Sequence, residues 1–393
     1  MPRQRAIVVA ALGTTQTLAW ASSYYLPAIL AEPIAADLGL SSSTLFAAFS
    51  GSLLLSAFLG PAVGRAIDRK GGRGVLAWSN LVFAAGLVML AFAQGVGGLL
   101  LAWAVLGVGM SMGLYDSAFA TLAGLYGRDA RASITGVTLI AGFASTVGWP
   151  ASALMASLWG WQGACLVWAG LHIVLGLPLN RLLIPPAPPP APAGDGAAEP
   201  ATPAPPGAMV LLAFVFAAAW FVTAAMAAHL PALLRDAGAT PAAAIAAAAL
   251  VGPAQVAARL VEFGLLRRFH PLATARLATL LHPLGAGVLL VLGAPAAAAF
   301  ALLHGAGNGM LTIAKGTLPL AIFGPVGYGL RSGLLSVPAR GTQAAAPFLF
   351  GLILEGNGPA TALLVSSGLS LAALAALLAL RAHPAPKPAV TSS

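Results

Sequence analysis

The chain has 393 residues, of which 59% are hydrophobic and only 7% are charged, and its mean hydropathy is +0.91. Water-soluble domains carry about 25% charged residues, so this composition excludes a soluble fold and indicates an integral membrane protein. The net charge of +9 comes from cations that lie between apolar stretches. Such scattered cations exclude a nucleic-acid-binding domain, which needs a contiguous basic face.

Twelve apolar stretches follow one another along the chain, each near the roughly 20 residues that a membrane-spanning helix needs. The Gly and Pro inside several of them are tolerated in membrane helices. We predict spans at 6–30, 43–67, 75–94, 98–125, 132–159, 163–184, 208–234, 241–263, 272–292, 296–317, 328–354 and 359–381. Arg3 and Arg5 before an apolar run also resemble the start of a cleavable signal peptide. The run continues through "TLAWASSYYLPAIL", so we expect it to remain as the first helix.

The positions of the cations predict the orientation of these helices. If the N-terminus lies inside the cell, the inner loops carry Arg3, Arg5, Arg65, Arg69, Lys70, Arg73, Arg128, Arg131, Arg181, Arg267, Arg268, Arg331, Arg381 and Lys387. The outer loops carry Arg235 with the acids Glu32, Asp37, Asp236 and Glu355. The positive-inside rule therefore predicts that both termini are cytoplasmic, and we expect the inner (plasma) membrane of a bacterium.

A Pro/Ala-rich segment, "PPAPPPAPAGDGAAEPATPAPP", divides six predicted spans from the other six. This composition favours a semi-extended linker rather than a helix or a core. We therefore predict a six-helix bundle at 1–184, a cytoplasmic linker at 185–207, a second six-helix bundle at 208–383 and a cytoplasmic tail at 384–393.

Short matches across this linker indicate an internal repeat. They recur at offsets between 198 and 204 residues: "LPAIL" from Leu26 with "LPALL" from Leu230, "DLG" from Asp37 with "DAG" from Asp236, "GVGMSM" from Gly107 with "GAGNGM" from Gly305, and Arg131 with Arg331. Two similar halves in parallel orientation are one repeat plan of secondary transporters, which bind their substrate near the membrane midplane between the halves.

The loop between the second and third spans, "GRAIDRKGGR" at 64–73, concentrates charge in a chain that has little. It resembles the signature loop of the major facilitator superfamily, with the pattern filled by Gly64, Asp68, Arg69, Gly71 and Arg73. The resemblance implies an all-α integral membrane fold of twelve transmembrane helices in two pseudo-symmetric six-helix bundles. It also implies that these residues form a cytoplasmic gate, with Asp68 near a helix N-terminus of the opposite bundle, where the helix dipole favours an acid. The alternative is that the cations only enforce topology.

Asp116 in "GLYDSAF" and Lys315 in "TIAKGTL" occupy nearly equivalent places in the two halves. One interpretation is a proton or substrate site. The plainer interpretation, which we favour, places both toward the cytoplasmic ends of their helices, with Asp116 joining the cytoplasmic gate as a partner of Arg73.

Ionisable residues inside the spans are the candidates for substrate binding, because each costs at least about 2.5–3.5 kcal/mol at bilayer depth and normally faces the bundle interior. Arg340 in "SVPARGTQAAAP" lies about 18 Å along its helix from Tyr328, at 1.5 Å per residue. Arg259, with Gln255 one turn earlier, can reach the same cavity from the eighth span. Such cations on helices eight and eleven resemble the oxalate and monocarboxylate porter branch, where they meet substrate carboxylates. The alternative is that Arg259 pairs with Glu262 three residues away.

Gln16, Trp20 and Tyr24 form a polar and aromatic stripe at i, i+4 and i+8 on the first span. We assign the stripe to the substrate cavity, with helix packing as the alternative. The histidines show no spacing typical of metal ligands and are expected to be hydrogen-bonded inside or at the membrane interface: His172, His229, His282 and His304. No cofactor or metal site is predicted.

The prediction is therefore a secondary active transporter that works by alternating access and is not an enzyme. Its favoured substrate is a small organic anion, a carboxylate, moved with protons or by exchange with a counter-substrate, by a monomer in the lipid bilayer. Efflux of drugs or metabolites by an antiporter is the alternative, although "GFASTVGWPASA" in the fifth span lacks the Gly-Pro, two residues, Gly-Gly pattern of many drug/proton antiporters in the family that the chain resembles. Trp103 also stands where an arginine is frequent in proton-linked relatives. A membrane enzyme is a remote alternative, because "GMSMG" at 109–113 matches G-x-S-x-G yet lies within an apolar helix where Gly109 and Gly113 suit packing. A non-transporting receptor is equally remote.

Overall fold

The computed structural model describes residues 3–187 and 206–380, which are almost entirely helical and contain no strand. The first half comprises α1 (Arg3–Ser22), α2 (Pro27–Asp37), α3 (Ser42–Lys70), α4 (Gly72–Ala91), α5 (Gly95–Gly113), α6 (Tyr115–Tyr126), α7 (Ala130–Ala141) and α8 (Ala144–Leu171), with short helical turns at His172–Gly176 and Leu179–Leu183. The second half comprises α9 (Ala208–Asp236), α10 (Pro241–Ala249), α11 (Val251–Gly264), α12 (Pro271–Leu292), α13 (Ala297–Phe323) and α14 (Tyr328–Ala379).

Local breaks explain how these helices form the twelve predicted spans. Pro27 begins α2 and separates it from α1 within the first span, while Leu114 has an extended backbone that separates α5 from α6 within the fourth. Conversely, α8 and α14 each continue from one span into the next through a glycine with a positive φ, Gly160 and Gly358. Glycine adopts this conformation without the steric penalty that other residues meet.

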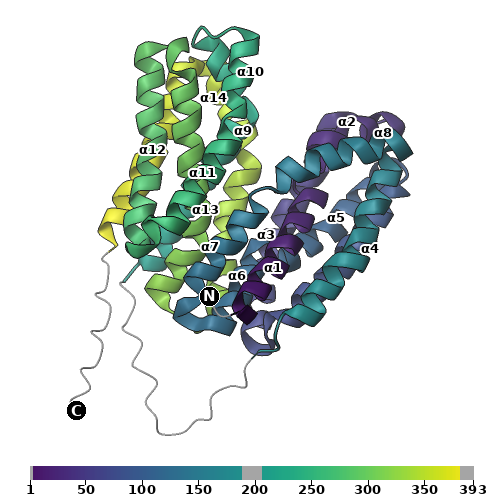
Figure 1. Ribbon diagram of the computed structural model, residues 1–393. Coiled ribbons are helices and arrows are strands. Elements are labelled where there is room, and N and C mark those ends of the chain that lie inside the picture. The colour runs from purple at the N-terminus through teal and green to yellow at the C-terminus, as the bar shows by residue number, and fades with distance from the viewer. Residues whose placement is uncertain (1–2, 188–205, 381–393) are drawn as a thin grey trace, which may run out of the picture.

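The two halves form two helical bundles that meet at one end and diverge at the other (Figure 1). α1 to α8 make the first bundle, and α9 to α14 make the second. The predicted linker 185–207 and tail 384–393 fall mostly or wholly outside the described residues, at 188–205 and 381–393, so the predicted domain boundaries stay a prediction.

The internal repeat is visible in the packing of the two bundles. A Cβ at Gly107 of α5 would collide with the backbone of Ser52 in α3, and a Cβ at Gly305 of α13 would collide with the backbone of Val251 in α11. The two glycines are 198 residues apart and their partners 199. Small residues let membrane helices approach closely, so each half uses the same glycine contact.

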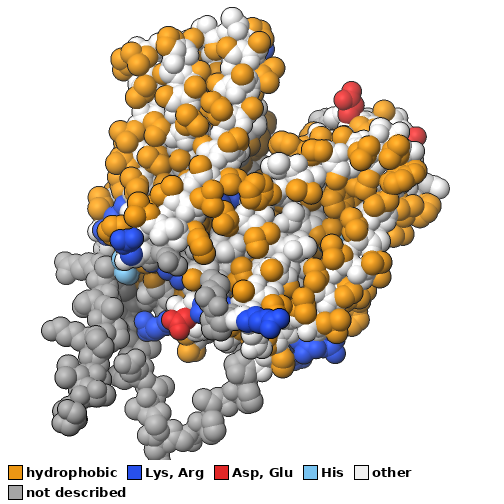
Figure 2. Space-filling view, viewed as in Figure 1, with side chains coloured by type: hydrophobic (Ala, Val, Ile, Leu, Met, Phe, Trp, Pro, Cys, Tyr) orange, Lys and Arg blue, Asp and Glu red, His pale blue; other side chains and the backbone are white. Residues whose placement is uncertain are grey.

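Apolar side chains cover the flanks of both bundles, and basic side chains gather where the bundles meet (Figure 2). Eight helical stretches of the described chain are long and apolar enough to cross a membrane. We call the end where α1 begins and α3 ends the basic face, because Arg69 and Lys70 lie exposed there. Between the opposite ends of the bundles the molecule is hollowed (Figure 2).

The buried histidines are hydrogen-bonded, as the sequence suggests. His172 lies 2.9 Å from Asn80 Oδ1 and 2.8 Å from Ser22 Oγ inside the first bundle. In the second bundle the Nδ1 atoms of His282 and His304 are 3.0 Å apart. These contacts satisfy polar groups that would otherwise destabilise a buried core.

Candidate functional site

The two bundles are joined at the basic face by Asp68, near the end of α3. Its carboxylate accepts hydrogen bonds from the backbone N–H groups of Gly329, at 2.8 Å, and Leu330, at 2.9 Å. These groups belong to the first turn of α14, where unpaired N–H donors and the helix dipole favour an anion. Gly64 and Gly329 bring the two backbones together, because a Cβ at either position would overlap the other residue's backbone.

The remaining residues of the signature loop act within the first bundle. Gly71 ends α3 with a φ of 77°, a conformation that favours glycine, so the chain can turn directly into α4. Arg73 Nε donates a hydrogen bond to the carbonyl of Arg181, at 2.8 Å, and Arg69 is exposed. Arg73 therefore holds α4 against the end of the sixth span.

A second contact between the bundles at the basic face involves Arg131, at the start of α7. Its Nη2 lies 3.0 Å from Glu262 Oε1 of α11, and its Nη1 donates to the carbonyl of Phe269 at 2.5 Å. The suggested pairing of Glu262 with Arg259 is therefore wrong. Glu262 pairs instead with Arg131 of the other bundle.

His270 lies beside this contact and caps α12, accepting a hydrogen bond at Nδ1 from the backbone N–H of Leu272, at 3.2 Å. Partial burial, and then the positive charges of Arg131 and Arg276, lower its pKa below the usual value of 6.5. A neutral imidazole is required for the cap, because the accepting nitrogen must keep its lone pair.

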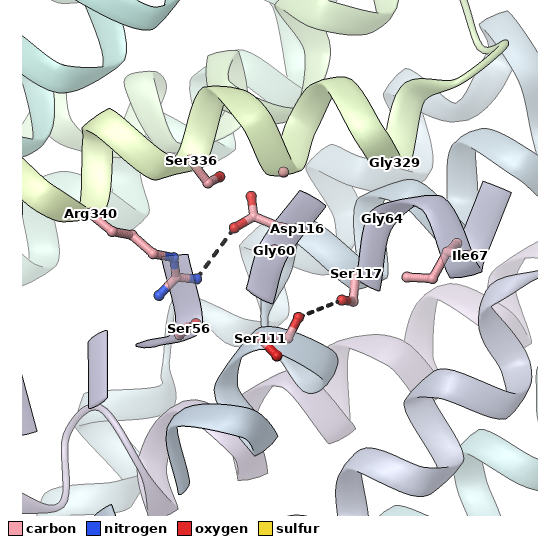
Figure 3. A pocket seen from close by; sticks show the side chains of 11 residues that line it. Ser56, Gly60, Gly64, Ile67, Ser111, Asp116, Ser117, Gly329, Ser336 and Arg340 are labelled. Carbon is pink, nitrogen blue, oxygen red and sulfur yellow. Dashed lines mark hydrogen bonds and ion pairs between the residues drawn. The ribbon is translucent and has the colours of Figure 1, made fainter. Parts of the chain in front are cut away.

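Deeper between the bundles, Asp116 of α6 meets two cations from the second bundle. Lys315 Nζ of α13 lies 2.9 Å from Asp116 Oδ1 and 3.2 Å from Oδ2. Arg340 Nη2 of α14 lies 3.3 Å from Asp116 Oδ2 (Figure 3). The side chains are 14%, 8% and 7% exposed for Asp116, Lys315 and Arg340. This trio is a buried ion cluster with one more cation than acid.

The predicted pairing of Asp116 with Arg73 is wrong, because Asp116 pairs with Lys315 and Arg340 and Arg73 bonds to the Arg181 carbonyl. Asp116 stands ten residues before Tyr126, about 15 Å from the end of α6 at 1.5 Å per residue, so it lies well inside the helical bundle and not at the end of its helix. This depth matches that of Arg340.

A small cavity adjoins the Asp116 carboxylate and Arg340 between α3, α5, α6 and α14 (Figure 3). Its volume of about 10 Å³ is room for about one water molecule. Its walls are glycines and serines: Ser56, Gly60, Gly64, Ser111, Ser117, Gly329, Gly333 and Ser336. Closely packed small residues therefore separate the ion cluster from the Asp68 contact.

Arg259 of α11 crosses to the first bundle. Its Nη1 donates to the Thr138 carbonyl at 3.3 Å, and its Nη2 to Gln255 Oε1 of its own helix at 3.4 Å. A Cβ at Gly142 would collide with the Arg259 guanidinium, so the glycine is what admits this side chain. Arg259 has no carboxylate partner in the described part of the chain.

An aromatic wall of the first bundle lies near these cations. Trp20 packs its ring against Tyr24, Tyr25 and Tyr115, with centroids 5.1, 6.1 and 5.0 Å away. Tyr24 accepts a hydrogen bond at its hydroxyl from Gln343 Nε2 of α14, at 2.8 Å. Tyr24 thus reaches the second bundle, and Trp20 packs beside it within the first.

Gln16, the third member of the predicted stripe, is placed differently. It is 1% exposed and donates from Nε2 to the Gly113 carbonyl, at 2.6 Å, within the first bundle. This contact binds α1 to the break between α5 and α6. Gln16 thus supports the backbone beside Tyr115 and Asp116.

Sequence reasoning did not assign a contact to Lys315, Arg131 or Tyr115. The near equivalence of Asp116 and Lys315 in the two halves was the available signal, because pseudo-symmetric positions face each other across the interface. The match of Arg131 with Arg331 did not indicate Glu262 as its partner, and nothing in the sequence singled out Tyr115, which packs against Trp20.

Comparisons with known proteins agree with this fold. A family model described as Major Facilitator Superfamily matches residues 12–303, whereas no curated protein matches the sequence. The human organic anion transporter MFSD10 (TETRAN) has a similar structure, with a TM-score of 0.71 at 16% identity, over 96% of this chain and 100% of that one. FucP in its outward conformation gives a TM-score of 0.74 at 13% identity, over 96% and 99%. A second FucP structure, described as the E. coli fucose:proton symporter, gives 0.68 at 15% identity, over 96% and 99%. The family match over most of its length, on this twelve-helix fold, shows that the chain belongs to the Major Facilitator Superfamily and is a transporter rather than an enzyme.

Proposed function

We propose that this protein is a secondary active transporter whose substrate is a small organic anion bearing a carboxylate. The observation that carries the proposal is the excess of positive charge between the bundles. Arg340 and Lys315 share a single acid, Asp116, and Arg259 bonds only to the Thr138 carbonyl and Gln255, because Glu262 pairs with Arg131.

Each unneutralised cation at membrane depth costs at least about 2.5–3.5 kcal/mol. Arg340 uses only Nη2 toward Asp116, and an arginine has five N–H donors in a planar fork that matches a carboxylate. A substrate carboxylate would supply the missing negative charge. The aromatic wall of Trp20 and Tyr24 would contact the remainder of the substrate, and Gln255 would hold Arg259 in place.

The contacts support alternating access with the basic face closed in this conformation. Asp68 and Arg131 join the bundles there, whereas the opposite ends diverge (Figure 1). Asp68 is exposed to solvent, and exposed charged contacts contribute little net stability, so the Asp68 contact can be broken when the bundles rock about the central site. The basic face would be cytoplasmic by the positive-inside rule, in the inner membrane of a bacterium, with the protein acting as a monomer.

Two neighbouring structures fit the proposal without establishing it. One is described as an organic anion transporter and another as a proton symporter, but both are less than 25% identical to this chain. The resemblance of Arg259 and Arg340 to the cations of the oxalate and monocarboxylate porter branch points to the same substrate class.

Efflux of drugs or metabolites is the second candidate. The aromatic wall favours it, because Trp and Tyr faces attract lipophilic cations. A cationic drug would then have to approach Asp116 past Lys315 and Arg340, which already occupy its carboxylate. This arrangement is why we rank efflux below anion transport.

The test is a thermal-shift screen of the purified protein against oxalate, succinate, lactate and benzoate, with tetraphenylphosphonium and ethidium as cations. We expect a carboxylate to stabilise the wild type and Arg340→Gln to abolish that stabilisation. Arg340→Lys should rescue poorly, because the bidentate fork is lost. Arg235→Gln, an exposed arginine at the opposite end of the molecule, is the matched control. Stabilisation by the cations alone would refute the proposal in favour of efflux.

A further inference from the structure

Lys315 occupies a position in the ion cluster that its ion pair does not explain. Its ammonium shares the Asp116 carboxylate with Arg340, so two cations divide one negative charge. All three side chains are at most 14% exposed. A buried charge without a full partner is strongly destabilising. A structural role alone therefore does not account for a second cation, Lys315, beside Arg340.

The surroundings of Lys315 offer no second acid. α6 presents Asp116, α14 presents Arg340, and α9 presents the ring of Trp220, whose centroid is 5.2 Å from Nζ. In the described part of the chain, no charged side chain of α7, α11 or α12 contacts Lys315. The cluster therefore carries a net charge of +1 when Lys315 is protonated and is neutral when it is not.

The three groups differ in their ability to exchange a proton. Arginine stays charged in proteins, whereas a buried lysine can lose its proton. A carboxylate beside two cations is favoured in its ionised form. We propose that Lys315 is the proton-binding group of the transport cycle, and that it takes up a proton together with the substrate anion. This inference rests on the proposed anion transport.

Charge balance explains how the two binding events are coupled. The empty site with neutral Lys315 has no net charge, and the site with protonated Lys315 and a monocarboxylate has none either. The protonated site without an anion carries +1 and meets the desolvation penalty of a buried charge when the cavity closes. Only the two neutral states of the site, empty with neutral Lys315 and loaded with protonated Lys315, would therefore allow the transporter to change readily between its two conformations. The Nζ lone pair takes the proton from water on one side and releases it to water on the other, so transport is electroneutral.

The first experiment observes this proton directly in the full-length protein. The chain has three lysines, Lys70, Lys315 and Lys387. Lysine labelled with ¹³C at the ε-carbon therefore gives three resonances that report the charge of each amine, and Lys315→Arg identifies its own by loss. We expect only the Lys315 resonance to titrate over the range of about pH 5 to 9, where ordinary lysines stay charged. The four carboxylates should move that titration to higher pH, because anion and proton binding are reciprocal.

The second experiment separates coupling from structure in proteoliposomes, with the monocarboxylates lactate and benzoate each as the labelled probe. Lys315→Arg keeps the cation but cannot release the proton. It should lose net uptake driven by a pH gradient and retain exchange of internal for external carboxylate. Lys387→Arg is the matched control and should retain both activities.

Two results would overturn the inference. One is a Lys315 resonance that keeps an ammonium shift throughout, with and without carboxylates. The other is gradient-driven uptake by Lys315→Arg equal to that of the wild type. A titrating Lys315 in a protein that neither binds nor transports any carboxylate would refute the proposed anion transport instead. The two failures are therefore distinguishable.

Discussion

Asp68→Asn should shift the protein from the conformation closed at the basic face toward one that is open there. Asp68 accepts two backbone hydrogen bonds from the start of α14, at 2.8 and 2.9 Å. A hydrogen bond to a charged group contributes about 1.5–3 kcal/mol, and a charge at a helix N-terminus about 0.3–1 kcal/mol. Asn retains one acceptor, and Asp68 is exposed to solvent. We therefore expect a loss of about 1–2 kcal/mol after discounting for screening.

This loss corresponds to a shift of about 5- to 30-fold in the ratio of the two conformations. A cysteine at Ser56, which is 1% exposed and lines the small cavity, reports the change when Cys165 is replaced by alanine. A membrane-impermeant thiol reagent added from the basic face should label Ser56→Cys faster by that factor in the Asp68→Asn background.

Asp37→Asn is the matched control for this experiment. Asp37 accepts hydrogen bonds from Trp161 Nε1, at 3.2 Å, and Gln162 Nε2, at 2.9 Å, within the first bundle. Asp37→Asn should therefore leave the ratio of the closed to the open conformation at the basic face unchanged. Equal labelling rates in the wild type and in Asp68→Asn, with unchanged transport, would refute the role of Asp68 in closing the basic face.

Three further predictions concern single side chains. Gly64→Ala should favour the open basic face as Asp68→Asn does, because its Cβ would overlap the Gly329 backbone; unchanged thiol labelling would contradict this close approach. Gly142→Ala should displace the Arg259 guanidinium and weaken carboxylate binding, while the protein still inserts into the membrane. Isothermal titration with the carboxylate that stabilises the protein most would measure this loss. An unchanged affinity would show that the contact of Gly142 with Arg259 does not affect binding. His270 should make the free energy of unfolding depend on pH, because folding lowers its pKa from 6.5. The neutral imidazole contributes its full stabilisation above pH 6.5, and this stabilisation is lost as the pH falls through the lowered pKa. His270→Asn, which keeps a capping side chain, should remove that part of the pH dependence of the melting temperature, and an unchanged profile would exclude His270 as its source.

Composition and periodicity were sufficient to predict the all-helical membrane fold. An apolar run long enough to cross a bilayer forms an α-helix unless it belongs to a closed β-barrel, because every backbone N–H and C=O group must find a hydrogen-bond partner within the protein. The repeat of "GVGMSM" and "GAGNGM" predicted two related halves, and in the structure Gly107 and Gly305 make equivalent contacts. These features depend on local sequence and on the solvent, so they could be read without knowing the tertiary structure.

The partners of the charged residues were decided only by the tertiary structure. Asp116 was assigned to Arg73, and a pairing of Glu262 with Arg259 was the alternative to substrate binding by Arg259, whereas the structure pairs Asp116 with Lys315 and Glu262 with Arg131. Sequence spacing gives the distance of a side chain along its helix, but it does not give the direction in which that side chain points. It also cannot show which residues of the two bundles meet, because an ion pair depends on a separation of a few ångströms between groups that lie some 130 to 220 residues apart.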